Sequence, residues 1–268
     1  MRFKVDHDYH IHSQLSTCSS DPAQTPERIL AYAEQFGLKT ICLTDHFWDE
    51  KVPGASKWYE PQNFAHVASA KPLPQSENVR FFFGCEAEMD KYDRLGISEE
   101  RLSEFDFIIV PTTHLHMSGF TIAEEEMSAE GRAKAYVRRF ESLLKMDLPF
   151  EKVGIAHLTC PLMYPKHNHH DVLDLVSDAV FLDLFKEAAK KGMGIELNTD
   201  IDCYQGEARE KELRPYFLAR EAGCRFYLGS DAHHPIGLDY AVYNFNNFVD
   251  ALDLKEEEKF DPFGGITP

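Results

Sequence analysis

The chain has 268 residues, 43% of them hydrophobic and 12% aromatic, which is enough apolar material for a sizeable core and argues against intrinsic disorder. Its 28 Lys and Arg residues are outnumbered by 45 Asp and Glu residues, and the net charge of −17 disfavours a broad basic face for nucleic acid or anionic membranes. A small anionic substrate is compatible with this charge if bound metals reverse the local sign.

The length is ordinary for one α/β barrel, so we predict a single domain over residues 1–268. The six cysteines form no CxxC pair and no dense framework, which is typical of reduced thiols. The start of the chain, MRFKVDHDYHIHS, lacks the apolar core of a signal peptide, and no run approaches the roughly 18 apolar residues of a membrane span. We therefore predict a soluble cytoplasmic protein, for which a homo-oligomer is a compatible state.

Short apolar or β-rich runs alternate with helical patterns along the chain. The predicted strands cover residues 3–9, 40–43, 81–85, 107–110, 153–156, 194–197 and 226–228. One helix is predicted over 26–36, with Thr25 as its N-cap and Gly37 ending it. Apolar stripes predict further helices around 133–144 and over 172–189.

Repeated strand-then-helix units predict a parallel sheet, either closed into a barrel or wound open. No GxGxxG or P-loop pattern follows the first strand, which weakens the case for a nucleotide-binding open sheet. The segments 48–64 and 111–130 are predicted to be long loops, and the tail after Lys255 is predicted to be peripheral.

Residues able to bind a metal stand at the C-terminal end of nearly every predicted strand. In chain order they are His10 and His12, Asp45 and His46, Glu86 and Glu88, His114 and His116, His157, Glu196 and Asn198, and Asp231 and His233. In a parallel barrel these strand ends converge on one mouth. Because imidazole and carboxylate ligands must come from several strands to surround an ion at roughly 2.0–2.2 Å, we predict a metal site there.

Each ligand-type residue also has a structural explanation when it is taken alone. Asp231 and His233 could cap the helix that follows them, and a lone HxH is a weak signal. Glu86 follows an almost wholly apolar strand, where a carboxylate needs a partner. The coincidence of seven strand ends favours the metal site over a set of unrelated structural roles.

Several other histidines fall outside this pattern. His66 lies in a probable helix, where we expect a structural or surface role. His167, His169 and His170 crowd one segment, KHNHH, and we expect a solvated polar loop there instead of a further metal site.

The pieces DYHIH, LTDHF, GCEAE, THLH, IAHL, IELNTD and GSDAHHP together resemble the PHP (polymerase and histidinol phosphatase) family. Each piece is weak alone, but the ordered set is specific, and it extends from Asp8 to about Gly237. The resemblance implies an α/β fold, a distorted (β/α)7 TIM-like barrel with its metal site at the C-terminal ends of the strands. It also implies two or three divalent metal ions, Zn, Mn or Fe.

Ligand sets follow from the same resemblance. One metal would take His10, His12, Glu86 and Asp231, and a second would share Glu86 and add His114 and His157. A third would take His46 and His233, with a remaining ligand from the loop after HxH.

That loop contains the clearest departure from the family, Cys18 in place of the usual His or Asp. A Cys18 thiolate could ligate the third metal, which zinc accepts readily and manganese or magnesium disfavours. Asp21 could replace Cys18 as the ligand, or the third metal could be absent.

The resemblance implies hydrolysis of a small phosphate ester. Bound metals lower the pKa of water, so a metal-bound hydroxide at the Glu86 bridge would attack phosphorus in line, with Asp231 beside it. His233 would protonate the leaving oxygen if no third metal is bound. IELNTD and GSDAHHP look most similar to the histidinol phosphatase branch, so we expect a monoester like histidinol phosphate.

Substrate contacts are predicted from position alone. Asn198 should line the mouth, and Arg132, Lys134 or Lys166 from a mouth loop are candidates for positive charge toward the phosphate. Two alternatives stay open, an amidohydrolase-type C–N hydrolase and a non-catalytic metal-binding module of the same family. Amidohydrolases commonly use a lysine bridge, whereas Glu86 stands where a bridge is needed here.

Overall fold

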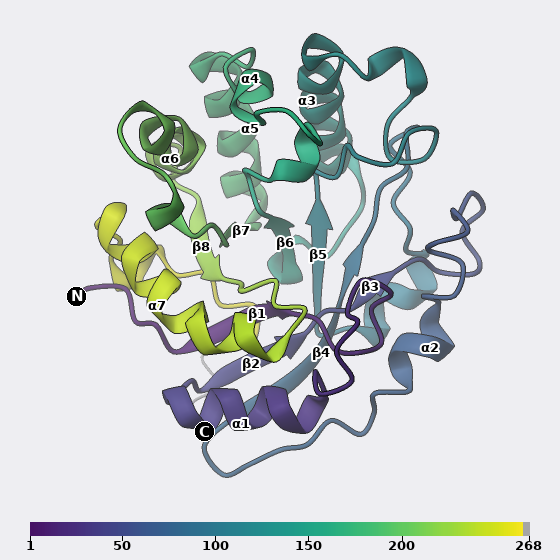
Figure 1. The fold of residues 1–268 in the computed structure, drawn as a ribbon, viewed down its shortest axis with the longest axis vertical. Helices are drawn as coiled ribbons and strands as arrows, with labels where there is room; N and C mark the ends of the chain where they lie inside the picture. The colour runs from purple at the N-terminus through teal and green to yellow at the C-terminus, as the bar shows by residue number, and fades with distance from the viewer. Residues whose placement is uncertain (265–268) are drawn as a thin grey trace.

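The computed structural model describes residues 1–264, and its strands form one parallel sheet. The sheet follows the order β1-β2-β4-β5-β6-β7-β8, and a short β3 pairs with β4 beside this path (Figure 1). The strands are β1 His7–Ile11, β2 Thr40–Leu43, β3 His46–Phe47, β4 Arg80–Ala87, β5 Phe107–Pro111, β6 Val153–Ala156, β7 Gly194–Leu197 and β8 Arg225–Leu228. Six of the seven predicted strands are found within about two residues of their expected bounds; the first lies further along the chain.

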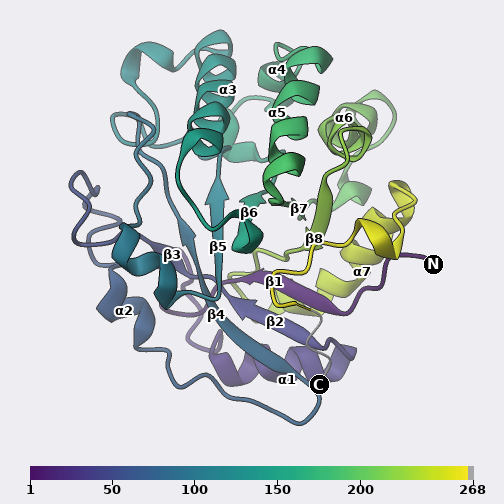
Figure 2. The same cartoon turned by 180° about the vertical axis from the view of Figure 1, so that it is seen from behind.

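Helices surround this sheet on its outer side, as the front and back views show (Figure 1, Figure 2). They are α1 Pro26–Phe36, α2 Phe64–Ala68, α3 Ala129–Lys145, α4 His170–Leu173, α5 Asp178–Lys191, α6 Glu207–Glu221 and α7 Pro235–Ala251. The structure is thus a distorted TIM-like α/β barrel, which confirms the predicted fold class. Within residues 1–264 no helix is long and apolar enough to cross a membrane.

Local signals explain where the helices begin and end. Thr25 accepts a hydrogen bond from the Arg28 N–H at 3.3 Å, and Gly37 ends α1 in the left-handed region at φ 72°. The helix predicted over 172–189 is instead divided into α4 and α5, because Ser177 caps a new helix by accepting from the Val180 N–H at 3.4 Å.

The barrel closes between β8 and β1 through the residues that follow β8. The Asp231 N–H donates to the carbonyl of His10 at 2.7 Å, and the His12 N–H donates to the carbonyl of Ala232 at 3.2 Å. These bonds draw the GSDAHHP segment against the end of β1. The first and last ligand-type segments of the sequence are thereby placed side by side.

Side chains fill the barrel below its mouth. Along β5, Ile108 and Val110 face the helices, whereas Phe107 and Ile109 join an inner cluster with Tyr227. The interior is therefore packed at the amino ends of the strands, which leaves the carboxyl ends for polar side chains.

The tail after Lys255 was predicted to be peripheral, and this is wrong for its first part. The Phe260 N–H donates to the carbonyl of Phe226 at 2.7 Å, and the Phe260 ring is 5% exposed in the inner cluster. A Cβ atom on Gly194 would lie 2.5 Å from that ring, so glycine is required there. The tail thus closes the amino-terminal end of the barrel.

The two predicted long loops contain no strand residue except Pro111, the last residue of β5, and they fold against each other near the mouth. Trp48 and Tyr59 of the first loop form a small buried cluster with Phe120 of the second. Their rings contact one another, with centroids 5.3 Å apart for Trp48 and Phe120 and 5.4 Å for Tyr59 and Phe120. This packing fixes the loops that flank the strand ends.

Candidate metal centre

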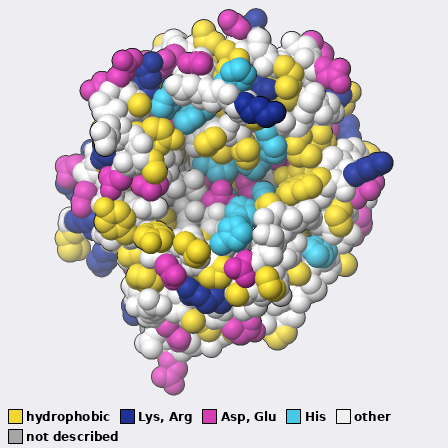
Figure 3. Space-filling model, viewed as in Figure 1, with side chains coloured by type: hydrophobic (Ala, Val, Ile, Leu, Met, Phe, Trp, Pro, Cys, Tyr) yellow, Lys and Arg dark blue, Asp and Glu magenta, His cyan; other side chains and the backbone are white. Residues whose placement is uncertain are grey.

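The carboxyl ends of the strands open into a hollow, in which histidines and acidic residues gather (Figure 3). Three groups of residues lie there, and within each group the ligand atoms are all within 4.8 Å of one another. They are His10, His12, Glu86 and Asp231; Glu86, His114 and His157; and His12, His46 and His233. The structure therefore brings the predicted ligands other than Cys18 together, from β1, β3, β4 and the segments that follow β1, β5, β6 and β8.

Glu86 lies at the centre of these groups and is 1% exposed. Five imidazole nitrogens surround its carboxylate within 4.0 Å: His46 Nδ1 at 2.8 Å, His12 Nε2 at 3.4 Å, His10 Nε2 at 3.6 Å, His157 Nε2 at 3.7 Å and His114 Nε2 at 3.8 Å. Neither carboxylate oxygen has a hydrogen-bond partner. Burial works to raise the pKa of Glu86, but the neighbouring His46 and His10 outweigh it and hold the pKa well below its usual value.

A buried carboxylate without a hydrogen-bond partner requires positive charge beside it, which His46 and His10 supply when they are protonated and which a bound metal ion would supply in their place. The surrounding donors are imidazole nitrogens and carboxylate oxygens, the ligand types that zinc, manganese and iron accept. The residues at the mouth therefore fit divalent metal ions, with Glu86 in the position of a bridge between two groups.

Most of the histidines are held through Nδ1, which turns Nε2 toward the centre. Their Nδ1 partners are Glu196 Oε1 for His10 at 2.6 Å, Ser16 Oγ for His12 at 2.9 Å, Glu88 Oε2 for His114 at 2.7 Å, Thr113 Oγ1 for His157 at 2.6 Å, and the Asp231 carbonyl for His233 at 2.8 Å. A carboxylate or carbonyl can only accept, so in the neutral rings of His10, His114 and His233 Nε2 is left without a proton. Such partners orient metal-binding histidines and fix their tautomer.

Glu196 and Glu88 hold the rings of His10 and His114 in place, a role that was not predicted for them. Glu196 also accepts the His157 N–H at 2.7 Å, and Glu88 accepts from Arg139 Nη2 at 2.9 Å. Strand parity carries the signal, because Glu88, the residue after β4, has the same parity as Glu86, while Ala87 between them packs in the outer hydrophobic core.

Asp45, between β2 and β3, precedes His46 and supports the first ligand pair instead of joining a ligand group. It accepts hydrogen bonds from the Ser13 N–H at 2.7 Å and from the Ser16 hydroxyl at 2.6 Å. Since Ser16 in turn holds His12, Asp45 supports the loop that positions the first ligand pair.

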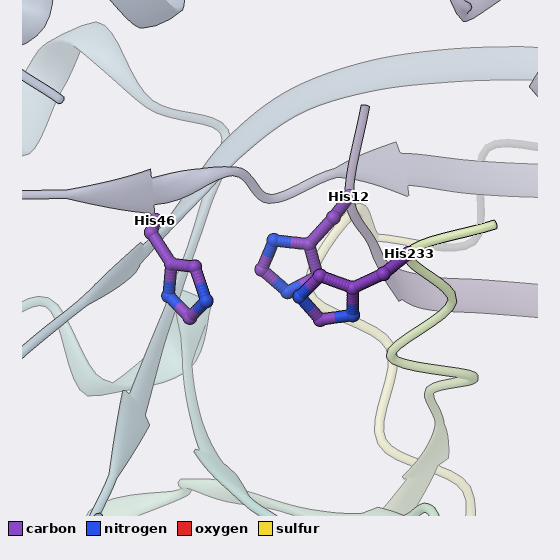
Figure 4. A group of neighbouring side chains, drawn as sticks. All are labelled: His12, His46 and His233. Carbon is purple, nitrogen blue, oxygen red and sulfur yellow. The ribbon is translucent and has the colours of Figure 1, made fainter. Parts of the chain in front are cut away.

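The third group comes from three separate segments (Figure 4). The rings of His12 and His233 stack with centroids 4.1 Å apart, and His46 faces them from β3. Cys18 is exposed and interacts with His233 and His46; burial opposes ionisation, but these two histidines lower the pKa of the thiol to about 7. Asp21 instead accepts the Ala23 N–H at 2.8 Å within its own loop.

Two of the predicted substrate residues lie at the rim. Asn198 is partly buried at the end of β7, and its Nδ2 donates to the carbonyl of Gly229 at 3.2 Å. Lys166 is exposed in the loop after β6, at a left-handed φ of 66°.

Arg132 has a different role from the substrate contact predicted for it. The side chain is buried, and its guanidinium donates to the carbonyl of Met127 at 2.9 Å, to that of Met163 at 3.1 Å and to that of Leu115. Because these bonds hold the guanidinium among backbone carbonyls, Arg132 fixes the loops around the mouth and is not available to a phosphate.

The solvated loop expected for the KHNHH segment is only partly present. His167 is exposed, but His169 and His170 are 6% and 3% exposed and both face Glu212. The partner lies 43 and 42 residues further along the chain, so the local sequence gave no sign of it.

Replacing Glu196 by Gln is expected to weaken metal binding 10- to 100-fold, the usual effect of removing the partner of a metal-binding histidine. An amide cannot accept from both the His10 ring and the His157 N–H, so one of the two contacts is lost. Competition with a chelator measures the affinity. Glu187→Gln, an exposed change on α5, is the control, and equal affinities in the two variants would contradict the role of Glu196.

Acidification is expected to release the metals, and the release should begin at a pH above 6.5. Burial favours the neutral imidazoles of His10 and His46, but the carboxylates Glu196 and Glu86 outweigh it and raise both pKa values well above the ordinary 6.5. Protons therefore already compete with metals above that pH, and affinity falls as pH decreases. Metal content after equilibration between pH 8 and pH 5 tests this; a constant content would show that protons do not displace the ions.

Comparisons with known proteins extend over most of the chain. A model of the PHP domain family matches residues 8–200. A probable phosphatase of Caldicellulosiruptor saccharolyticus is 25% identical over 210 residues, which are 78% of this chain and 73% of that protein. A probable phosphatase of Caldicellulosiruptor bescii is 25% identical over 211 residues, 78% of this chain and 72% of its own.

Among solved structures, this fold is similar to that of histidinol phosphate phosphatase from Lactococcus lactis, a crystal structure in complex with zinc, L-histidinol and phosphate. The TM-score is 0.61 at 19% identity, and the match covers 96% of this chain and 98% of that one. The shared fold thus includes the segment after residue 200, which the family model does not match.

Proposed function

The chain belongs to the PHP domain family, and on that premise we propose that it is a metal-dependent phosphatase that hydrolyses a small phosphate monoester. The observation that carries the proposal is the buried carboxylate of Glu86, which lacks hydrogen-bond partners and is surrounded by five imidazole nitrogens. The phosphatases among its relatives support the reaction class.

Two ligand groups would hold metals through Glu86, and His12, His46 and His233 would hold a third ion with Cys18. When bound, divalent ions there supply positive charge to phosphate oxygens and lower the pKa of water to near neutrality. Glu86 keeps the groups together, and Glu196 and Glu88 hold His10 and His114 in the orientation that ligation needs.

Asp231 and His233 are the members of the site that reach the rim, with side chains 28% and 21% exposed. Asp231 Oδ1 lies 3.0 Å from His12 Nε2, and the left-handed backbone at Asp231, with φ 52°, turns the segment over the mouth. From there the His233 imidazole would face an incoming ester and deliver a proton to the leaving oxygen when it is not itself a ligand.

For the substrate we propose a monoester like histidinol phosphate. The similarity of IELNTD and GSDAHHP to the histidinol phosphatase branch supports this choice, as does the Lactococcus lactis structure with L-histidinol and phosphate. Asn198 and Lys166 are the rim residues proposed to contact it.

Phosphate release from histidinol phosphate, other phosphomonoesters and phosphodiesters, with metal content measured in parallel, tests the proposal. Metals with selective cleavage of histidinol phosphate would support the narrow substrate. Cleavage of other esters alone would keep the phosphatase and discard that substrate. A metal-loaded protein inactive on every ester would overturn the phosphatase proposal.

The proposed ligation by Cys18 predicts a specific effect of Cys18→Ser. We expect the variant to lose one zinc ion per chain, because a hydroxyl is a far poorer zinc ligand than a thiolate. Elemental analysis after removal of free zinc measures this. Cys203→Ser changes another exposed cysteine and should keep every ion; if both variants keep the wild-type zinc content, Cys18 is not a ligand.

A further inference from the structure

A second histidine-carboxylate cluster lies outside the groups around Glu86. It joins His169, at the start of α4, and its neighbour His170 to Glu212 of α6. All three side chains are buried, with His169 6%, His170 3% and Glu212 1% exposed. Their ligand atoms lie within 4.8 Å of one another.

The two carboxylate oxygens of Glu212 have different partners. Oε1 accepts from the hydroxyls of Thr159 and Thr199, the latter at 3.1 Å. Oε2 faces His169 Nε2 at 2.8 Å and His170 Nε2 at 2.7 Å. The threonines therefore orient the carboxylate, and one oxygen and two imidazole nitrogens are left to converge on one point.

This cluster has no permanent cation among the described residues. Glu88 is equally buried, but Arg139 lies 2.9 Å from it, whereas the ion pairs of Glu212 within 4.0 Å involve only the two histidines. Burial works to raise the pKa of Glu212, but hydrogen bonds from His169, Thr159 and His170 outweigh it and keep the pKa below its usual value. A buried ionised carboxylate needs an opposite charge close to it.

Two histidines and one glutamate are a ligand set that zinc accepts, with a fourth position left for water or a ligand group. The hydroxyls behind Glu212 match the outer partners that orient metal-binding carboxylates. We propose that His169, His170 and Glu212 bind a zinc ion of their own, separate from the ions around Glu86. This ion ties the end of the loop after β6 to α6. Thr159 of that loop, which donates to Glu212, lies two residues after His157, a proposed ligand of the site around Glu86.

Crystals of the full chain grown with zinc chloride test the site directly. We expect an anomalous difference peak at the zinc edge between the Nε2 atoms of His169 and His170 and Oε2 of Glu212, in addition to peaks near Glu86. Peaks near Glu86 with none at Glu212 would overturn the proposal without affecting the proposed phosphatase function.

Zinc content in solution gives a second readout that does not depend on activity. His170→Gln should bind one zinc ion fewer per chain than the wild type, while His167→Gln, an exposed change in the same loop, should bind the wild-type number. Equal numbers in both variants would show that the imidazoles only hydrogen-bond to Glu212. If His170→Gln does not fold, Glu212→Gln replaces it, since the amide retains the shape of the side chain.

Discussion

Glu86→Gln is expected to lower phosphatase turnover by more than about 10³-fold, beyond the 10- to 100-fold effect of removing a partner behind a metal ligand. The change removes the one charge that five imidazole nitrogens surround, and with it the proposed bridge between two ligand groups. We also expect at least two ions to be lost. Phosphate release and elemental analysis of the purified variant measure the two effects.

Stability separates this loss from unfolding. In the presence of a chelator, the variant should still unfold in one cooperative thermal transition, as a folded domain does, so that the lost turnover is assigned to the missing carboxylate and not to a lost fold. Glu187→Gln again serves as the exposed control. Full activity of Glu86→Gln on several phosphomonoesters would refute the bridge.

Arg139→Met is expected to lower the free energy of unfolding by about 3–5 kcal/mol, the typical result of removing one partner of a buried ion pair. Arg139 is fully buried in α3, and its guanidinium donates to Glu88 at 2.9 Å and to the carbonyls of Met89, Thr121 and Pro111 at 2.9–3.0 Å. Without it, Glu88 keeps its buried charge and the three carbonyls lose a donor. Thermal unfolding should show a decrease of about 10 °C.

The adjacent residue provides a matched control for this prediction. Arg138 pairs with Asp93 and Glu126, but its side chain is 38% exposed, so Arg138→Met should lower the free energy of unfolding by no more than about 1 kcal/mol. Equal losses in the two variants would mean that the burial of the Glu88 pair contributes nothing. A reduced metal affinity of Arg139→Met is also expected, because Glu88 holds His114.

Local rules were enough to predict most of the fold and the position of the candidate site. Thr25 and Gly37 marked the ends of α1, and the ends of the apolar strands marked where His10, Glu86 and His157 would meet. These inferences succeed because capping, strand parity and parallel pairing depend on residues close in sequence or on the closed barrel itself.

The predictions that were wrong involve partners far apart in the chain. Arg132 carries the positive charge that a phosphate contact needs, but its guanidinium donates to backbone carbonyls of two loops. His169 and His170 become buried through a glutamate of α6, and Phe260 becomes buried through its contact with β8. No periodicity in the sequence reports such tertiary contacts.

The seam between β1 and the segment after β8 determines when the mouth can form. Asp231 bonds to the backbone of His10, so ligands from the first dozen residues meet ligands made more than two hundred residues later. During synthesis on the ribosome, His10 and His12 emerge long before Asp231, and contacts of such long sequence separation form slowly. The ligand group that joins His10 and His12 to Asp231 can therefore form only after the segment behind β8 has been made.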